Sequence, residues 1–535
     1  MQIKNFWEKF LKKLEENIVS IFGLFLAFFI LGKIIFQKGF VFFTDFVHGP
    51  NVKYIFSANN IFINSELYLF DFISPEFSSK IIFFTTILLL YFAGSFFAKN
   101  FTDNKYLQIF AGSFAVLNLF VYERILYGQI GVTLSLAFYI FFLSFLVKSS
   151  NQSLEKQKSF YVLSSGIFAG LALDSSLHSI FFILFTLFVF FIFNNNFKEN
   201  FIKSISIIII AILVNSYFFI NIFLGKNETL NFVNSKISAS DFLAFQTVGS
   251  NIFHKIFNLL FLTGFWGREQ MRFLDITDNP IWFLGFLPFA FLIIFGIYKM
   301  YKQNKKFFNI SISFIIFVPI LATATSINFL SFLYKFIPFY SGLREPQKWA
   351  MILVPIYILA IIFAVKNIKN ISEKSLSIIL ILLLIIFQNK FLFAFSSQMH
   401  AANFPESLQK VNEVINKEES KCESKNLFLP WHLYLSFPFT KNVVANPANY
   451  FFTCKFVTGT NMEFGGIFDN NLNKESNEYG YWLFENNENL PPENTKFIVV
   501  AKTLDWERYN WLAEKIYLQK IFEDENIILY KVITN

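Results

Sequence analysis

This sequence carries little charge for its length. Asp, Glu, Lys and Arg make up 15% of its 535 residues, and hydrophobic residues make up 55%; soluble domains hold about 25% charged residues. Many stretches of about 16 to 22 residues have no charge, which is enough helix to cross a hydrocarbon core about 30 Å thick. The composition argues against a soluble globular protein and predicts a polytopic membrane protein.

Cysteine is almost absent. The chain has two cysteines, Cys422 and Cys454, and both lie in the C-terminal segment 396–535. Disulfides form in oxidising compartments outside the cytoplasm. If the segment 396–535 lies outside the cytoplasm, as argued below, its two cysteines predict one disulfide. The alternative is two unrelated thiols.

The sequence also lacks internal repeats, Gly/Ser-rich linkers and charges in the middle of its apolar runs. Secondary transporters place ionisable groups near the midplane, on broken helices in repeated halves. The missing charges therefore argue against a channel or a secondary transporter. The missing linker predicts that residues 396–535 sit directly on a membrane domain formed by residues 1–395.

Eleven membrane spans are predicted, which gives an all-α polytopic bundle. They are 17–36, 80–98, 106–121, 131–147, 159–173, 178–194, 204–224, 281–298, 307–325, 350–365 and 376–395. The first apolar run lacks a small-residue cleavage site, so it is interpreted as a retained span. The N-terminal 17 residues are amphipathic and rich in lysine, as is typical of an interfacial helix.

The basic residues are concentrated in alternate loops along the chain. Lysine, without arginine, marks the N-terminus and alternate short loops, which are 99–105, 148–158, 195–203, 299–306 and 366–374. This positive-inside pattern places the N-terminus in the cytoplasm and, with an odd number of spans, the C-terminal segment outside. It also accounts for the net charge of +8, so no nucleic-acid partner is expected.

Two long loops and the C-terminal segment are expected outside the cytoplasmic membrane. The loops 37–79 and 225–280 contain short amphipathic stretches that we interpret as interfacial helices. The segment 396–535 has the pattern of a small α/β domain. It begins with a helix near 405–420, continues with strand-like runs at 426–431, 441–446, 496–502 and 526–532, and has an amphipathic helix near 505–520.

Charged and histidine residues gather at the predicted outer ends of the spans, where they are costly unless paired or facing a wet cavity. Asp45, in "GFVFFTDFVHGPN", is the favoured carboxylate, because a raised pKa at the mouth of an apolar cleft suits a general base. The alternative is an ordinary loop carboxylate or helix cap. His48 is a candidate accessory group or metal ligand.

Two further clusters flank spans. In "NLFVYERILYGQIG", Glu123 and Arg124 point about 100° apart on a helix, so each needs its own partner; the alternative is helix-end anchoring. In "SGLREPQKWA", Arg344 and Lys348 are suited to binding an anionic phosphate, with interfacial snorkelling as the alternative. The spacing of Asp174 and His178 suits a metal pair, but two residues do not make a metal site.

These segments resemble the GT-C fold of membrane glycosyltransferases, in the uncharacterised bacterial and archaeal branch that includes relatives of the mycobacterial arabinofuranosyltransferases. The resemblance rests on an acid just after the first span, on "VYERILYGQIG", "LREPQKW" and "LLFLTGFW", and on the architecture of residues 1–350. It implies a polyprenyl-phosphate sugar donor and a glycan, lipid or protein acceptor. The family often shows Asp-x-Asp in the first loop. Here Asp45 stands alone, and Glu66 or Asp71 would have to supply a second acid.

The resemblance assigns roles to the candidate residues. Asp45 would be the base that activates the acceptor hydroxyl. No cofactor is expected with certainty, and a requirement for a divalent metal ion is left open. The residues expected to bind substrate are His48, Glu123, Arg124, Gln129, Arg344, Glu345, Lys348, Trp431 and His432. Trp431, His432 and Tyr434, in "LPWHLYLSF", would hold the acceptor glycan by stacking, unless they belong to a domain core.

The sequence thus predicts an inverting glycosyltransferase that acts at the outer face of the cytoplasmic membrane in cell-envelope glycan assembly. A transporter or flippase of lipid-linked sugars is the alternative, and a scaffold with a degraded site is a third. Transfer of label between lipid donor and acceptor would distinguish the enzyme from a flippase.

Overall fold

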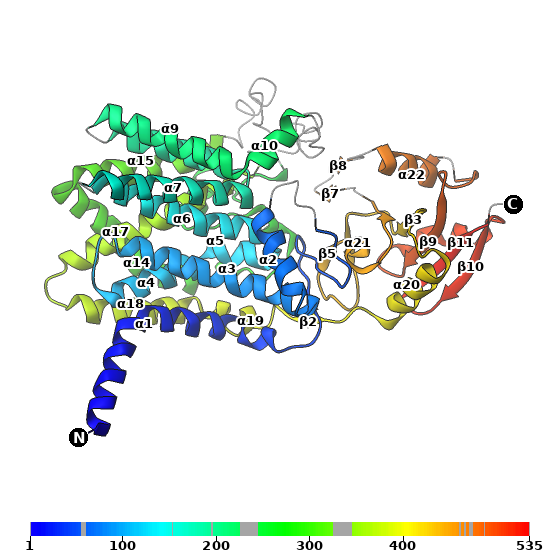
Figure 1. The fold of residues 1–535 in the computed structure, drawn as a ribbon, viewed down its shortest axis with the longest axis horizontal. Helices are drawn as coiled ribbons and strands as arrows, with labels where there is room; N and C mark the ends of the chain where they lie inside the picture. The colour runs from blue at the N-terminus through cyan, green and yellow to red at the C-terminus, as the bar shows by residue number, and fades with distance from the viewer. Residues whose placement is uncertain are drawn as a thin grey trace.

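The structure is a computed structural model of the 535-residue chain. A bundle of helices forms one end of the molecule and a mixed sheet with its helices forms the other (Figure 1). The described residues are 2–54, 60–151, 154–193, 196–224, 244–324, 345–459, 462–464, 467–469, 474–485 and 487–533.

The described residues between 2 and 396 are mainly helical. The helices are α1 (Gln2–Ile35), α2 (Ile61–Asp71), α3 (Pro75–Ala98), α4 (Lys105–Val116), α5 (Leu119–Tyr127), α6 (Ile130–Asn151), α7 (Glu155–Ser175), α8 (Ser179–Ile192), α9 (Phe197–Val214), α10 (Ser216–Phe223), α13 (Ile252–Leu260), α14 (Pro280–Gln303), α15 (Lys305–Ala324), α17 (Leu353–Asn367), α18 (Glu373–Phe387) and α19 (Leu392–Ser396). Short 3-10 helices are η1 (Trp266–Gln270), η2 (Ile276–Asp278), η5 (Pro346–Ile352) and η6 (Asn389–Phe391).

Several of these helices are long and apolar enough to cross a membrane. Among the described residues there are six such helices, or up to eight if each of two bent pairs counts as one span. The pairs are α4 with α5, bent by 43°, and Glu373–Phe387 with Asn389–Ser396, bent by 62°. The chain is therefore a multi-pass membrane protein. The eleven spans remain a prediction; α8, for example, has 14 residues, and α7 begins with a charged turn.

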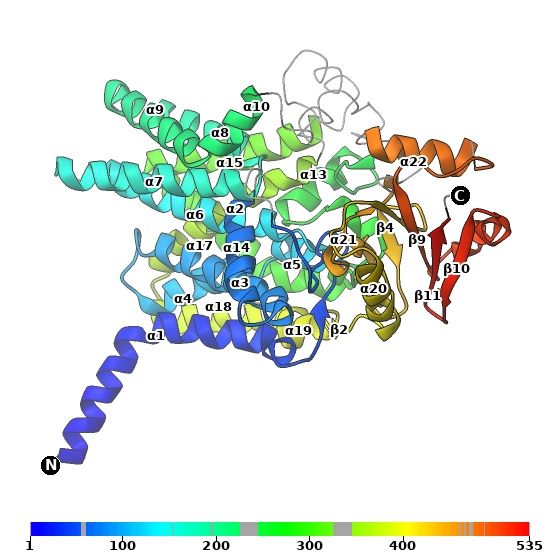
Figure 2. The same ribbon diagram turned by 45° about the vertical axis from the view of Figure 1, so that its right-hand side comes forward.

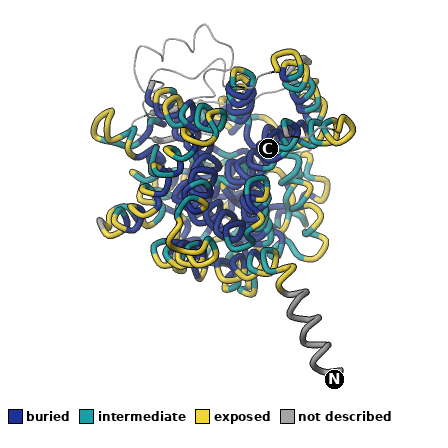
Figure 3. The backbone as a smooth tube through the Cα atoms, turned by 90° about the vertical axis from the view of Figure 1, so that its left-hand side faces the viewer, coloured by how far each residue is buried: buried dark blue, intermediate teal, exposed yellow. Residues whose placement is uncertain are grey.

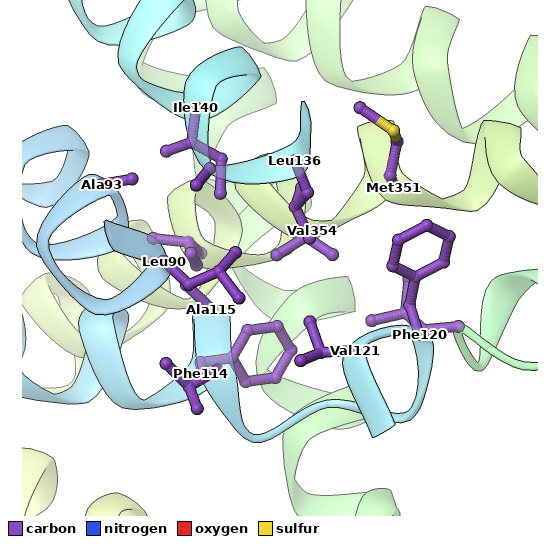
Figure 4. Close-up of a cluster of buried hydrophobic side chains, with 14 of the residues drawn as sticks. Leu90, Ala93, Phe114, Ala115, Phe120, Val121, Leu136, Ile140, Met351 and Val354 are labelled. Carbon is purple, nitrogen blue, oxygen red and sulfur yellow. The ribbon is translucent and has the colours of Figure 1, made fainter. Parts of the chain in front are cut away.

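Large apolar side chains fill the centre of the bundle. Phe114 of α4, Phe120 of α5, Leu136 of α6 and Val354 of α17 meet in one cluster (Figure 4). The buried positions lie along the middle of the bundle and exposed ones along its outside (Figure 3). Exposed Phe, Leu and Ile are frequent on the outer faces, as expected for helices that face lipid rather than water.

The C-terminal residues form a mixed sheet with helices. Its strand order is β10-β11-β9-β3-β6, and Figure 2 shows this part at one end of the bundle. The strands are β3 (Lys425–Leu429), β6 (Phe456–Val457), β9 (Thr495–Ala501), β10 (Leu518–Glu523) and β11 (Ile527–Val532), and the main helices are α20 (Glu406–Glu418) and α22 (Lys474–Glu485). The outer strands β10, β11 and β9 pair antiparallel, whereas β3 runs parallel to β9 and β6.

One element of this part differs from the sequence prediction. The amphipathic helix expected near 505–520 is a 3-10 helix, η7 (Trp506–Glu514), followed by strand β10. The strand pairs with β11 at the sheet edge, and that pairing outweighs the helical pattern of its sequence. The structure joins Cys422 and Cys454 in a disulfide, which ties the end of α20 to the chain just before β6.

Short strands connect the two parts. Strand β1 (Phe40–Val41) pairs with β2 (Ala401–Ala402), and the hairpin of β4 (Tyr434–Ser436) and β5 (Val443–Ala445) lies against the loop after β1. The backbone N–H of Ala445 donates to the carbonyl of Thr44 at 3.0 Å, and that of Asn51 donates to Tyr450 at 2.9 Å. The loop around Asp45 is therefore held between the bundle and the C-terminal part.

Candidate active site

A cavity of about 470 Å³ lies between the helix bundle and the C-terminal part. Ligand pockets typically measure about 300 to 1,000 Å³, so its size suits a small ligand or part of a larger one. Residues from both parts line it: Thr44, Asp45, Tyr127, Gln129, Phe245, Trp266, Gln270, Arg272 and Glu345 from one side, and His432, Tyr434, Leu435, Ser436, Val443, Thr503, Leu504, Asp505 and Arg508 from the other.

Asp45 is fixed in this cavity by the end of α5. The backbone N–H of Asp45 donates to the carbonyl of Tyr127 at 2.9 Å. Gly128 ends the helix in the left-handed conformation with φ +92°, and a Cβ there would lie 2.7 Å from the backbone nitrogen of Phe46. A side chain at position 128 would push the Asp45 loop away. The stretch "YGQ" thus accounts for the placement of the carboxylate.

Two side chains hold the carboxylate of Asp45. The Gln129 amide donates to Oδ2 at 3.0 Å, and the Tyr434 hydroxyl donates to Oδ1 at 2.9 Å. Tyr434 lies 389 residues away in the sequence, on strand β4. The bundle and the C-terminal part therefore each contribute one hydrogen bond to the same carboxylate.

The surroundings of Asp45 change its acidity. The surface of Asp45 faces the cavity and is accessible to water. Protein on both sides of the cavity nevertheless displaces most of the surrounding water. This desolvation raises the pKa of Asp45 to about 6, even though the hydrogen bonds from Gln129 and Tyr434 lower it. Burial and the charge of Asp45 keep the pKa of Tyr434 well above its ordinary value, so Tyr434 donates its proton to the carboxylate. A carboxylate with a pKa near 6 is suited to general-base chemistry close to neutral pH.

A buried group of charges lies beside Asp45. Glu345 accepts hydrogen bonds from Lys348 at 2.8 Å, from Trp266 at 3.1 Å and from Arg124 at 3.4 Å. Burial alone would raise the pKa of Glu345, but the charges of Lys348 and Arg124 hold it below its ordinary value. Arg124 also donates to the Gln129 side-chain oxygen at 2.5 Å. The network therefore fixes the amide that binds Asp45.

Glu123 and Arg124 have separate partners, which confirms the expectation from their positions on a helix. Glu123 accepts a hydrogen bond from the Thr263 hydroxyl at 2.6 Å, and its Oε1 lies 3.8 Å from Nε of Arg268. Arg124 turns toward Glu345, and its guanidinium lies 3.8 Å from the centre of the Phe265 ring. Glu123 does not line the cavity. It holds the loop 263–268 against α5.

Three other candidates lie away from the cavity. His48 is 1% exposed and its Nε2 lies 3.0 Å from Asp71 and 2.8 Å from the Ser78 hydroxyl; it was expected to bind substrate, but the structure places it in this separate cluster. Asp174 accepts the backbone N–H groups of Ile61 and Phe62, both at 2.9 Å. These two bonds satisfy the N-terminal N–H groups of helix α2, and Nδ1 of His178 lies 3.5 Å from Nζ of Lys348.

Trp431 and His432 are adjacent but lie in different places. Trp431 is 2% exposed and packs in a hydrophobic cluster that includes Tyr479 and Leu429. Trp431 therefore lies in the domain core, which was the alternative to a stacking role. His432 points into the cavity with Asp505. Arg344, expected to bind phosphate, lies outside the described residues.

The cavity includes residues that the sequence did not single out as binding residues. Arg272 lines it, and its Nε is buried without a hydrogen bond to any described residue. Arg124 and Lys348 pair with Glu345 and do not line the cavity. Arg272 was only one of many charged residues at the outer span ends, and no spacing rule distinguished it from its neighbours. Tyr434 was expected to stack on the acceptor glycan, and its hydrogen bond to Asp45 was not foreseen.

The second acid expected in the first long loop is not beside Asp45. Asp71 binds His48, Tyr54 and Ser78, and Glu66 lies on α2 outside the cavity lining. Within the part of the chain that the structure describes, no group of three or more His, Cys, Asp or Glu side chains lies close enough to hold a metal ion.

Comparisons with known proteins identify the fold. No protein-family model matches the chain, and no curated protein matches its sequence. Solved structures do match. The arabinofuranosyltransferase AftD from Mycobacteria is 10% identical with a TM-score of 0.60, and ArnT from Cupriavidus metallidurans in the apo state is 9% identical with a TM-score of 0.55. The match covers 97% of this chain in both cases.

The extent of the two matches differs. The chain spans 40% of the length of AftD but 98% of the length of ArnT. AftD and ArnT are both GT-C membrane glycosyltransferases. At this level of identity the likeness shows the fold alone, and it confirms the GT-C resemblance seen in the sequence.

Proposed function

We propose that this protein, which has the GT-C fold, is an inverting glycosyltransferase that uses a polyprenyl-phosphate sugar at the outer face of the cytoplasmic membrane. The observation that carries this proposal is Asp45, a carboxylate with a pKa of about 6 that is held at a cavity between the two parts. The structural neighbours are glycosyltransferases. The lysine-rich loops support the same sidedness, because the positive-inside rule predicts that the opposite end of the bundle faces away from the cytoplasm.

The reaction follows from this geometry. Asp45 takes the proton of an acceptor hydroxyl as its oxygen forms a bond to the anomeric carbon. The bond between that carbon and the phosphate oxygen breaks, and the polyprenyl phosphate leaves with the electron pair. Attack opposite to the leaving phosphate inverts the anomeric configuration. A single carboxylate is sufficient for this step, because the phosphate is already an adequate leaving group.

Arg272 is our candidate for the phosphate contact. It lines the same cavity as Asp45, and its Nε has no hydrogen bond to a described residue. An arginine binds phosphate through two parallel N–H···O bonds and stabilises the charge that develops as the bond breaks. Arg124 and Lys348 act indirectly, because neither lines the cavity and both pair with Glu345, while Arg124 also fixes Gln129.

Replacement of Arg272 by glutamine tests this contact. Loss of a charge-assisted bond costs about 1.5 to 3 kcal/mol, so we expect the KM for a polyprenyl-phosphate sugar to rise by about 10- to 150-fold. The measurement is initial-rate kinetics with radiolabelled donor. Lys53→Gln, at an exposed position of the first long loop, serves as the control. An unchanged KM in Arg272→Gln would assign the phosphate to another cation.

Tyr434→Phe tests the contact across the two parts. The Tyr434 hydrogen bond stabilises the charged form of Asp45, so its loss should raise the Asp45 pKa. Since the base must be deprotonated, the acid limb of kcat/KM should move to higher pH, while the rate above that limb is largely kept. The pH profile of Tyr481→Phe, whose ring is 56% exposed, should stay at the wild-type position. Coincident profiles for all three proteins would contradict the role of Tyr434.

The proposal as a whole is tested by a transfer assay. Purified protein in lipid vesicles would receive polyprenyl-phosphate sugars carrying labelled pentose or hexose, together with cell-envelope glycan fragments. We expect label to move covalently to an acceptor, with inversion at the anomeric carbon. Movement of labelled lipid across the vesicle without covalent transfer would support the flippase alternative instead.

A further inference from the structure

The C-terminal part has three parallel strands, and the loops after two of them, β3 and β9, line the cavity. Strands β6, β3 and β9 run parallel to one another. His432 follows β3 by three residues and Asp505 follows β9 by four, and both side chains line the cavity. In sheets of this kind ligands bind outside the carboxyl ends of the strands. The edge that meets Asp45 is therefore the edge at which an α/β sheet usually binds its ligand.

The side chains at this edge form one connected group. His432 Nε2 lies 2.9 Å from Oδ2 of Asp505, and Nη1 of Arg508 lies 3.7 Å from the same oxygen. Asp505 adopts the left-handed conformation, with φ 62°, which turns the chain after β9. Gly459, two residues after β6, lies so close that a Cβ there would be 2.5 Å from the His432 backbone nitrogen. The three strand ends thus pack tightly behind the group.

We propose that His432, Asp505 and Arg508 form an acceptor subsite that binds a neutral saccharide by its hydroxyl groups and directs one hydroxyl to Asp45. This inference rests on the proposed function. Carboxylate oxygens accept hydrogen bonds, guanidinium N–H groups donate them, and imidazole can do either. Such a group suits the neighbouring hydroxyls of a sugar ring, each of which donates and accepts.

The rest of the wall supports a sugar ring. Leu435, Val443 and Leu504 line the same side of the cavity, and Leu504 is 80% exposed. These apolar side chains match the C–H faces of a ring, whose hydroxyls lie at its edge.

The charges favour a neutral acceptor over an anionic one. Arg508 and Asp505 form an ion pair, so their charges offset each other. Asp45 lies in the same cavity and is negative when it acts as the base. An acidic acceptor would bring its own charge toward this carboxylate, and like charges at close range in such surroundings repel. Arg272 on the bundle side remains for the donor phosphate.

The experiment measures binding to the intact protein by native mass spectrometry. The probes are a neutral hexose tetrasaccharide, the same tetrasaccharide ending in a uronic acid, a serine-containing peptide and polyprenyl phosphate. The variants are Asp505→Asn, Arg508→Gln and, as a control, Glu507→Gln. Asparagine tolerates the left-handed conformation of position 505, Arg508 is 77% exposed in its side chain, and Glu507 is exposed but does not line the cavity.

We expect Asp505→Asn and Arg508→Gln to weaken tetrasaccharide binding at least 10-fold and to leave polyprenyl phosphate binding unchanged. Glu507→Gln should bind both probes as the wild type does. Wild-type affinity in Asp505→Asn and Arg508→Gln would overturn the subsite, and so would tighter binding of the uronic acid or of the peptide. Retained polyprenyl phosphate binding shows that each variant is folded.

The two arms separate this inference from the proposed function. Failure of the wild type to bind polyprenyl phosphate would count against the lipid-phosphate donor, while the tetrasaccharide arm would still report on the subsite. Failure of the wild type to bind any saccharide, with polyprenyl phosphate bound, would overturn the subsite alone.

Discussion

Replacement of Asp45 by asparagine is expected to reduce sugar transfer by about 10²- to 10⁴-fold, the usual contribution of a general base. Asparagine keeps the shape of the side chain and its contact with Tyr434, but it cannot take a proton. Donor binding should therefore persist. The measurement is single-turnover transfer together with native mass spectrometry of polyprenyl phosphate. Asp278→Asn, at an exposed position before α14, should transfer at the wild-type rate.

The wild-type pH dependence provides a second test of the same residue. The base form of Asp45 is present above its pKa of about 6, so kcat/KM should fall as the pH drops below about 6. In Asp45→Asn the remaining rate should lose this acid limb. Transfer at the wild-type rate in Asp45→Asn, or an acid limb that survives the substitution, would remove Asp45 from the proton transfer.

Glu345→Gln is expected to destabilise the protein more than any other substitution in the cavity wall. Glu345 is 9% exposed and is the shared partner of Arg124 and Lys348. Its loss leaves two buried cations without their carboxylate, and breaking a buried ion pair costs about 3 to 5 kcal/mol. The apparent Tm in detergent should drop sharply. Glu269→Gln, in which an exposed carboxylate is removed, should melt like the wild type.

A double variant separates charge from packing. In Glu345→Gln with Lys348→Gln one uncompensated cation is removed together with the carboxylate. If charge imbalance causes the loss, the double variant should regain part of the stability that the single variant loses. Equal or greater loss in the double variant would show that Glu345 acts through shape and hydrogen bonding instead.

The sequence alone determined the membrane character, the predicted sides of the loops and the choice of Asp45 as the candidate general base. Long uncharged runs have one stable environment, because a backbone in lipid must satisfy its hydrogen bonds as a helix. Helical geometry likewise separated Glu123 from Arg124, since adjacent helical residues point about 100° apart. Two cysteines in one segment had each other as the nearest partner. Such inferences need only local geometry or composition.

Only the tertiary structure decided which residues share the cavity. Tyr434 and Asp45 lie 389 residues apart, and no periodicity predicts that a strand of the C-terminal part reaches the first loop. His48 lies three residues from Asp45 but turns to Asp71, and Trp431 turns to the domain core while His432 faces the cavity. Sequence patterns constrain which residues lie near one another along the chain. The direction of each side chain and the pairing of distant segments follow from packing, which the whole fold determines.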